Sequence, residues 1–82
     1  MIRKETKASI LVVEDEESLR EALKLNLELE GYEVTTVDNG PDVLKVVKNE
    51  YFDLIILDIM LPDMDGITVC ETIRMQHNEV PI

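Results

Sequence analysis

Short, wholly apolar runs alternate along this chain with segments in which apolar residues recur every three or four positions. Residues 10–13 (Ile-Leu-Val-Val) and 54–57 (Leu-Ile-Ile-Leu) carry no polar side chain, which predicts two strands buried on both faces of a sheet. Residues 32–37 mix apolar residues with threonine and predict a third strand nearer the sheet edge. A segment with helical spacing follows each run, so the chain alternates strand and helix.

The helical segments contain residues that typically start and stop helices. The apolar residues of the first segment are Leu19, Ala22, Leu23 and Leu27. Ser18 and Glu21 form a capping-box pattern near its start, and Gly31 is placed to end it. In the second segment Pro41 follows turn residues and suits the first turn of a helix. The third segment is expected to place three residues on one face: Ile67, Cys70 and Ile73.

Strands that alternate with helices are joined by right-handed crossovers and form a parallel sheet with helices on both faces. The two wholly apolar strands should be central neighbours, with the strand at 32–37 outside the first, which gives the order 2-1-3 of a flavodoxin-like sheet. We therefore predict an α/β three-layer sandwich whose last residues begin a fourth strand. Residues 1–9 should form a flexible polar leader, and residues 10–82 a single domain.

The charge of the chain restricts its partners. Its 82 residues carry 18 acidic and 8 basic side chains, for a formal net charge of −10. This balance argues against direct binding to nucleic acid or to an anionic membrane, and it favours cations and basic protein surfaces. The single cysteine, Cys70, cannot form an internal disulfide, and no apolar run is long enough to span a bilayer or to act as a secretory signal. We therefore expect a cytoplasmic protein.

Acidic residues follow both wholly apolar strands at the point where each one ends. Glu14 and Asp15 follow the first strand, and Asp58 follows the other. Neighbouring strands lie about 4.8 Å apart, so these carboxylates should converge at one edge of the sheet, where their repulsion favours a bound cation. Oxygen ligands that leave positions for water or phosphate suit magnesium better than zinc or calcium. A magnesium ion also prepares an adjacent carboxylate to accept a phosphoryl group.

Residues 10–16 and 53–66 together resemble the receiver-domain signature of two-component response regulators. The likeness extends from about residue 10 to residue 82. It implies that Asp58 is the phosphoacceptor, that Asp15 binds magnesium directly and that Glu14 acts on the ion through water. By the same resemblance, the phosphoryl donor is a histidine kinase or a phosphotransfer protein, and an output domain lies elsewhere in the protein.

The resemblance also assigns roles to the segment that follows Asp58. The backbone carbonyl of Met60 would be a further magnesium ligand. Pro62 and Gly66 would shape the loop, because proline fixes φ and glycine permits conformations that other residues avoid.

Receiver domains have five strands, and these residues supply three and the beginning of a fourth. In the family a Ser or Thr ends the fourth strand and a Lys ends the fifth. Neither is assigned here, because Thr68 and Thr72 belong to the third helical segment and the last lysine is Lys48. We therefore expect an incomplete receiver domain that binds magnesium weakly and is a poor phosphoacceptor on its own. The strand at Leu54–Leu57 would lie at a sheet edge, so we expect either a homo-oligomer that covers this edge or a fragment of a longer chain.

Two other functions stay open. A truncated interaction module would assemble through the exposed sheet edge and perform no phosphotransfer. A magnesium-dependent phosphatase with an aspartate nucleophile would need a second acid two residues after the nucleophile, where this chain has Met60. Asp15 taken alone is more typical of a helix cap or a turn, but two apolar strands that both end in acid favour a functional site. Because Met60 stands where the phosphatase needs an acid, we expect a phosphoacceptor signalling domain rather than an enzyme.

Overall fold

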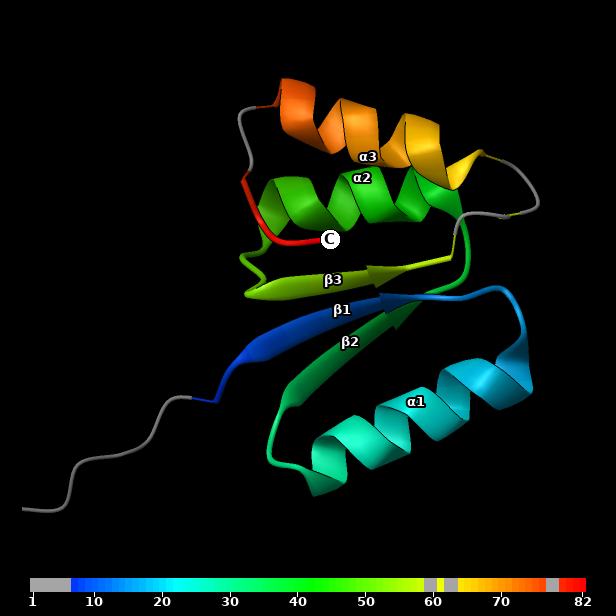
Figure 1. The fold of residues 1–82 in the computed structure, drawn as a ribbon, viewed down its shortest axis with the longest axis vertical. Helices are drawn as coiled ribbons and strands as arrows, with labels where there is room; N and C mark the ends of the chain where they lie inside the picture. The colour runs from blue at the N-terminus through cyan, green and yellow to red at the C-terminus, as the bar shows by residue number, and fades with distance from the viewer. Residues whose placement is uncertain (1–6, 59–60, 62–63, 77–78) are drawn as a thin grey trace, which may run out of the picture.

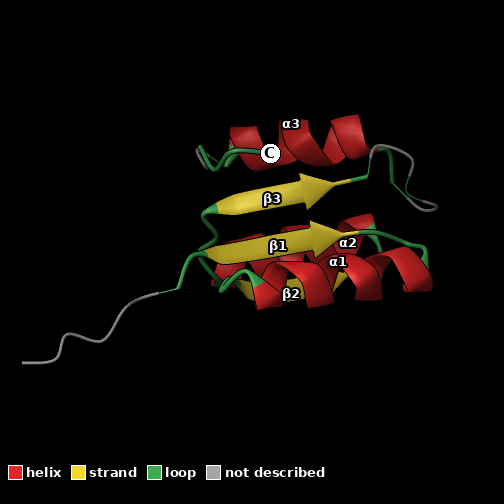
Figure 2. Cartoon of the chain, turned by 60° about the horizontal axis from the view of Figure 1, so that its bottom comes forward, coloured by secondary structure: helices red, strands yellow, loops and turns green. Residues whose placement is uncertain are grey.

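Three parallel strands form a sheet that lies between one helix and a pair of helices (Figure 1). The computed structural model describes residues 7–58, 61, 64–76 and 79–82. The elements in chain order are β1 (Ser9–Val13), α1 (Glu17–Leu29), β2 (Glu33–Val37), α2 (Gly40–Asn49), β3 (Leu54–Leu57) and α3 (Gly66–Met75). Figure 2 shows α1 in front of the strands and α2 behind them, which makes a three-layer α/β sandwich. Within the described ranges, no helix combines the length and the apolar character needed to cross a membrane.

The sheet has the predicted order, β2-β1-β3, with both pairs of strands parallel. Leu11 of β1 pairs with Thr35 of β2 on one side and with Ile55 of β3 on the other. The two wholly apolar strands are therefore neighbours, as their composition indicates. The first strand begins one residue earlier than predicted, because Ser9 pairs with Glu33 and belongs to β1; residues 1–6 of the predicted leader lie outside the described residues.

The outer side of β3 is bordered by the last residues of the chain. The backbone N–H of Ile55 donates to the carbonyl oxygen of Pro81 at 2.9 Å. Val80, beside it, is only 8% exposed and packs in the core. Residues 79–82 thus lie along β3 where the sequence predicts the beginning of a fourth strand, although they do not form a strand themselves.

Helix α1 differs from its prediction at its start and agrees with it at its end. The predicted capping box is wrong, since Ser18 lies inside the helix and the cap residue, Glu16, makes no side-chain capping hydrogen bond. The turn is instead held from upstream, where the Glu14 carboxylate accepts a hydrogen bond from the Glu16 N–H at 3.0 Å. Gly31 has a φ of 95°, a conformation that favours glycine, and it follows the end of the helix as predicted.

The face of the sheet under α1 is only partly covered. Helix α1 contacts β1 and β2, and none of its residues is buried. Leu23 and Leu27 are half-buried, whereas Leu19 is 43% exposed. Leu54 and Ile56, which point to this face because side chains alternate along a strand, are also only half-buried. Among the described elements, one helix serves three strands on this side, so part of an apolar surface is left open.

The main core lies on the opposite face, between the sheet and the pair α2 and α3. Its buried residues are Leu11, Val13, Val43, Val47, Phe52, Ile55, Leu61, Val69, Ile73 and Val80. Helix α2 begins as the sequence predicts: the Asn39 side chain caps it by accepting from the Asp42 N–H, and Pro41 stands in its first turn. Val43 and Val47 of this helix are buried in the core, and Leu44 and Val46 pack against it.

The predicted apolar face of α3 is partly wrong. Ile67 is 58% exposed, and the core-facing residues are Gly66, Val69 and Ile73. The reason is the start of the helix: Asp65 caps it, so the inward positions follow from Gly66 at helical spacing. Cys70 lies beside this face and is half-buried.

Two leucine substitutions should separate core packing from surface exposure. Leu11 is 0% exposed, so Leu11→Ala leaves a cavity and should lower the free energy of unfolding by about 3 kcal/mol. Leu29 is 75% exposed, and Leu29→Ala should change that free energy by less than about 0.5 kcal/mol. Urea denaturation followed by circular dichroism measures both values. Equal effects of the two substitutions would contradict the placement of the core.

Candidate metal centre

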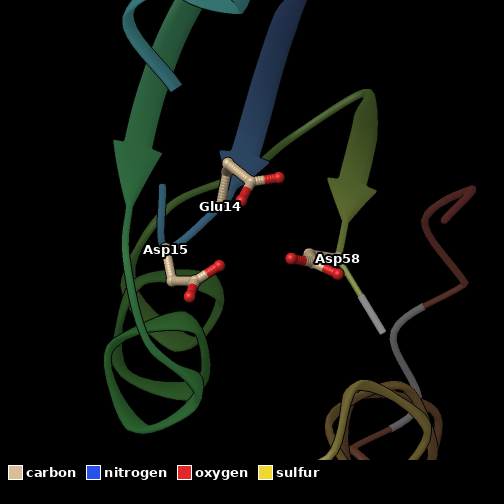
Figure 3. A group of neighbouring side chains, drawn as sticks. All are labelled: Glu14, Asp15 and Asp58. Carbon is tan, nitrogen blue, oxygen red and sulfur yellow. The ribbon is translucent and has the colours of Figure 1, made fainter. Parts of the chain in front are cut away.

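Three acidic side chains meet beyond the carboxyl ends of β1 and β3. The ligand oxygens that Glu14, Asp15 and Asp58 offer all lie within 4.8 Å of one another. Figure 3 shows Asp15 and Asp58 facing each other across the gap between the two strand ends, with Glu14 close to both. The three residues come from two segments more than forty positions apart in the sequence, and the structure brings them together as predicted.

The strand pairing holds these residues in place through their backbones. The N–H of Asp58 donates to the carbonyl oxygen of Val13 at 3.1 Å. The N–H of Glu14 donates to the carbonyl oxygen of Val37 at 3.1 Å. Both bonds continue the parallel ladder one residue past the strands, so the acids are positioned by the sheet itself rather than by a free loop.

Glu14 is the most buried of the three acids, at 9% exposed. The hydrogen bond that its carboxylate accepts from the Glu16 N–H lowers the pKa of Glu14. Burial, a hydrogen bond with Asp15 and the negative charges of Asp58 and Asp15 raise it. The net result is that the pKa of Glu14 lies above its ordinary value of 4.5. A proton or a cation in this cluster is therefore favoured, because either one reduces the repulsion between the carboxylates.

Arg20 is a member of the site that the sequence analysis did not identify. Its guanidinium Nη1 donates to the carbonyl oxygen of Glu14 at 3.0 Å and to that of Asp15 at 3.4 Å. Arg20, in the first turn of α1, thereby holds the backbone of Glu14 and Asp15. The only signal in the sequence is an arginine five residues after Asp15, which is too common on an exposed helix to indicate this contact.

The donor set fits magnesium. The cluster offers three oxygen ligands from carboxylates, and the described residues there contribute no thiol or imidazole of the kind that zinc prefers. Asp15 is exposed, so coordination positions on its side are open to water or to a phosphoryl oxygen. Magnesium usually keeps several waters and takes one or two carboxylates together with phosphate.

The remaining predicted residues lie in the segment after β3. Met60 and Pro62 lie outside the described residues, so their assigned roles stay predictions. Gly66 is buried and is the first residue of α3, which places it at the end of this segment. Leu61, between them in sequence, is 8% exposed and packs in the core.

Comparison with known proteins gives one consistent family. A family model described as response regulator receiver domain matches residues 10–82. The alkaline phosphatase synthesis transcriptional regulatory protein PhoP of Bacillus subtilis is 51% identical over 73 residues, which cover 89% of this chain and 30% of PhoP. The chain spans about a third of the length of the curated relatives it matches.

Two solved structures of the response regulator TrrA of Thermotoga maritima have the same fold. TrrA in complex with Mg2+ and BeF is 45% identical, with a TM-score of 0.81, over 84% of this chain and 60% of TrrA. TrrA in complex with the histidine kinase ThkA is 42% identical, with a TM-score of 0.83, over 89% of this chain and 63% of TrrA.

The raised pKa of Glu14 predicts the pH dependence of folding. The folded chain binds this proton at a higher pH than the unfolded chain does, so stability should fall as the pH rises from 4.5 through the raised pKa. Glu14→Gln removes that dependence and should make the chain more stable than the wild type near neutral pH. Urea denaturation at several pH values, without divalent cations, measures the slope.

The control is Glu71→Gln, the same substitution on the exposed side of α3. It leaves the cluster intact and should keep the wild-type slope. If the stability of Glu14→Gln changes with pH as steeply as that of the wild type, the pKa of Glu14 is not raised in the folded chain.

Proposed function

This chain belongs to the response regulator receiver domains, and on that premise we propose that Asp58 accepts a phosphoryl group beside a magnesium ion. The observation that supports the proposal most is the convergence of three carboxylates, with ligand oxygens within 4.8 Å, at the edge where β1 and β3 end. Among solved relatives, TrrA binds Mg2+ and BeF. A phosphoacceptor needs its carboxylate next to a cation site and open to the donor; Asp58 lies in a cluster of carboxylates that could hold a cation, and it is only half-buried.

Each acid has a distinct role in this proposal. Asp15 is the direct ligand, because it is exposed and faces Asp58 (Figure 3). Glu14 acts through water, because its Oε2 is already bound to the Glu16 N–H. Met60 supplies its backbone carbonyl. Magnesium, when bound, shields the charge of the acceptor and of the transferring oxygens.

Asp58 then performs the chemistry. One of its carboxylate oxygens attacks the phosphorus of the donor in line with the leaving atom, so a new O–P bond forms as the bond to the donor breaks. Arg20 holds the backbone of Glu14 and Asp15 while the charge at the centre changes. The product is an aspartyl phosphate, and the chain turns over only its own phosphoryl group, which makes it a signalling domain rather than an enzyme with a separate substrate.

The partner in this proposal is a histidine kinase or a phosphotransfer protein. TrrA has been solved with the histidine kinase ThkA, and the net charge of −10 suits a basic docking surface. Because the relatives include transcriptional regulatory proteins such as PhoP, we infer that phosphorylation controls a transcriptional output carried by another part of the protein. A cytoplasmic location is part of the same proposal.

An interaction module that assembles through β3 is the second candidate. The half-buried Leu54 and Ile56 favour it, since they leave apolar surface open beside this strand. Against it, the Ile55 N–H already donates to Pro81 within the same chain. Sedimentation distinguishes the two: a concentration-dependent dimer supports assembly, and a folded monomer argues against it.

Acetyl phosphate with magnesium tests the phosphoacceptor proposal directly. We expect slow, substoichiometric phosphorylation of this chain at Asp58, detected by mass spectrometry of peptides, and none without magnesium. Asp58→Asn should abolish it. Asp53→Asn is the matched control, because Asp53 precedes the other end of β3, where its carboxylate accepts from the Ser9 N–H.

A modification that persists in Asp58→Asn, or that does not depend on magnesium, would contradict the proposal. Stoichiometric modification of wild-type Asp58 would support Asp58 as acceptor and would overturn the expectation that this chain is a poor acceptor on its own.

A further inference from the structure

The turn between β1 and α1 is short, and two of its residues belong to the metal centre. Only residues 14–16 separate the end of β1 from the start of α1, and Figure 1 shows this turn leading from the arrowhead of β1 into the helix. Glu14 and Asp15 offer carboxylate oxygens to the cluster, and Glu16 is the last residue before the helix. The same three residues therefore set the position of both carboxylates and of the first turn of α1.

The start of α1 depends on contacts with this turn. Asn39 and Asp65 cap α2 and α3 with their side chains, whereas the side chain of Glu16 makes no capping hydrogen bond to α1. The first N–H groups of a helix have no partner within the helix, so a start without a cap is held by other contacts or by water. One such contact is the hydrogen bond from the Glu16 N–H to the Glu14 carboxylate at 3.0 Å.

Arg20 supplies the contacts from the helix side. Its side chain is half-buried, and its Nη1 donates to the carbonyl oxygens of Glu14 at 3.0 Å and of Asp15 at 3.4 Å. Its own backbone N–H donates to the carbonyl oxygen of Glu16 at 2.9 Å. Arg20 thus binds all three residues of the turn. Hydrogen bonds from a charged donor are stronger than those between neutral groups, which suits the guanidinium to this task.

Both side-chain hydrogen bonds of Arg20 end on main-chain oxygens. They leave the carboxylate oxygens of Glu14 and Asp15 to a cation, with which an ion pair to either carboxylate would compete. The guanidinium also brings a positive charge close to the proposed place of a divalent cation, and this repulsion by itself opposes metal binding. Arg20 can favour the ion only by holding the backbone, so its position and its charge predict opposite effects of its removal.

We propose that Arg20 is a positioning residue that couples the metal centre to the first turn of α1: its two side-chain hydrogen bonds fix the backbone that carries Glu14 and Asp15. This inference rests on the proposed function of that centre. Coupling between two sites is reciprocal, so a contact that favours the bound ion is itself strengthened by the ion. Loss of the Arg20 contact should weaken magnesium binding, and magnesium should stabilise the start of α1.

Arg20→Met removes both side-chain hydrogen bonds and keeps an unbranched apolar stem. It should weaken magnesium binding by roughly tenfold, the size of effect seen when groups that support metal ligands are changed. A titration with MgCl2, followed by the NMR shifts of the Asp15 and Asp58 amides, measures the affinity. Lys24→Met is the matched control, because Lys24 is half-buried one turn further along α1 and carries the same charge. That variant should bind magnesium as tightly as the wild type or slightly more tightly.

Hydrogen exchange tests the coupling in the other direction. In the wild type, magnesium should slow the exchange of the Arg20 N–H, which donates to Glu16 at the start of α1. The Glu30 N–H donates to Asn26 at the other end of the helix and should not respond. In Arg20→Met the effect of magnesium on the backbone N–H of position 20 should be lost. A general loss of stability would instead speed exchange at both ends of α1 and keep the response to magnesium.

The outcomes separate this inference from the function on which it rests. A wild-type chain that does not bind magnesium overturns the proposed function, and exchange without metal then still tests Arg20. Without metal, Arg20→Met should exchange faster than the wild type at position 20 and equally at Glu30; equal exchange at position 20 overturns the positioning role.

Where the wild type binds magnesium, the affinities of the two variants decide. An affinity of Arg20→Met equal to that of Lys24→Met, or tighter, shows that only charge matters and overturns the inference. Should Arg20→Met fail to fold, the wild type still provides the test, because an Arg20 N–H whose exchange magnesium does not slow overturns the coupling.

Discussion

The parallel pairing of β1 with β3 is the constraint on which the candidate site depends. Val13 is in register with Leu57, and the next residue of each strand is an acid. The hydrogen bond from the Asp58 N–H to Val13 carries this register one step beyond the strands. A slip of one residue in either strand would turn every side chain to the opposite face and separate the carboxylates. The apolar residues that set the register of the two strands therefore also fix the geometry of the acids.

Repulsion between the three carboxylates lowers the stability of the fold that brings them together. Burial and neighbouring charges raise the pKa of Glu14 even though the Glu16 N–H favours its charged form. The charged form of Glu14 therefore lowers the stability of the folded chain near neutral pH, and shifted pKa values of this kind are common at functional sites. Arg20 reduces the freedom of the cluster's backbone, because the guanidinium binds the carbonyl oxygens of Glu14 and Asp15.

Much of this arrangement could be predicted from the sequence. Two wholly apolar runs that both end in acid were enough for the strand order and for the convergence of Glu14, Asp15 and Asp58. Contacts that depend on where a helix starts could not be predicted in the same way. The capping box at Ser18 failed because the Glu14 carboxylate holds the turn, and Ile67 is exposed because Asp65 sets the start of α3. Arg20 donates to backbone carbonyl oxygens, and contacts of this kind leave no pattern in a single sequence.

The most direct test of this account is to locate a bound divalent cation in the chain. Crystals soaked in Mn2+, a substitute for Mg2+ with a measurable anomalous signal, would show where the ion binds. We expect one ion between Asp15 and Asp58, with Glu14 reached through water, and loss of that ion in Asp15→Asn. An ion bound elsewhere, or none at the carboxylate cluster when the chain is saturated, would contradict the claim that the pairing of β1 with β3 builds a metal centre.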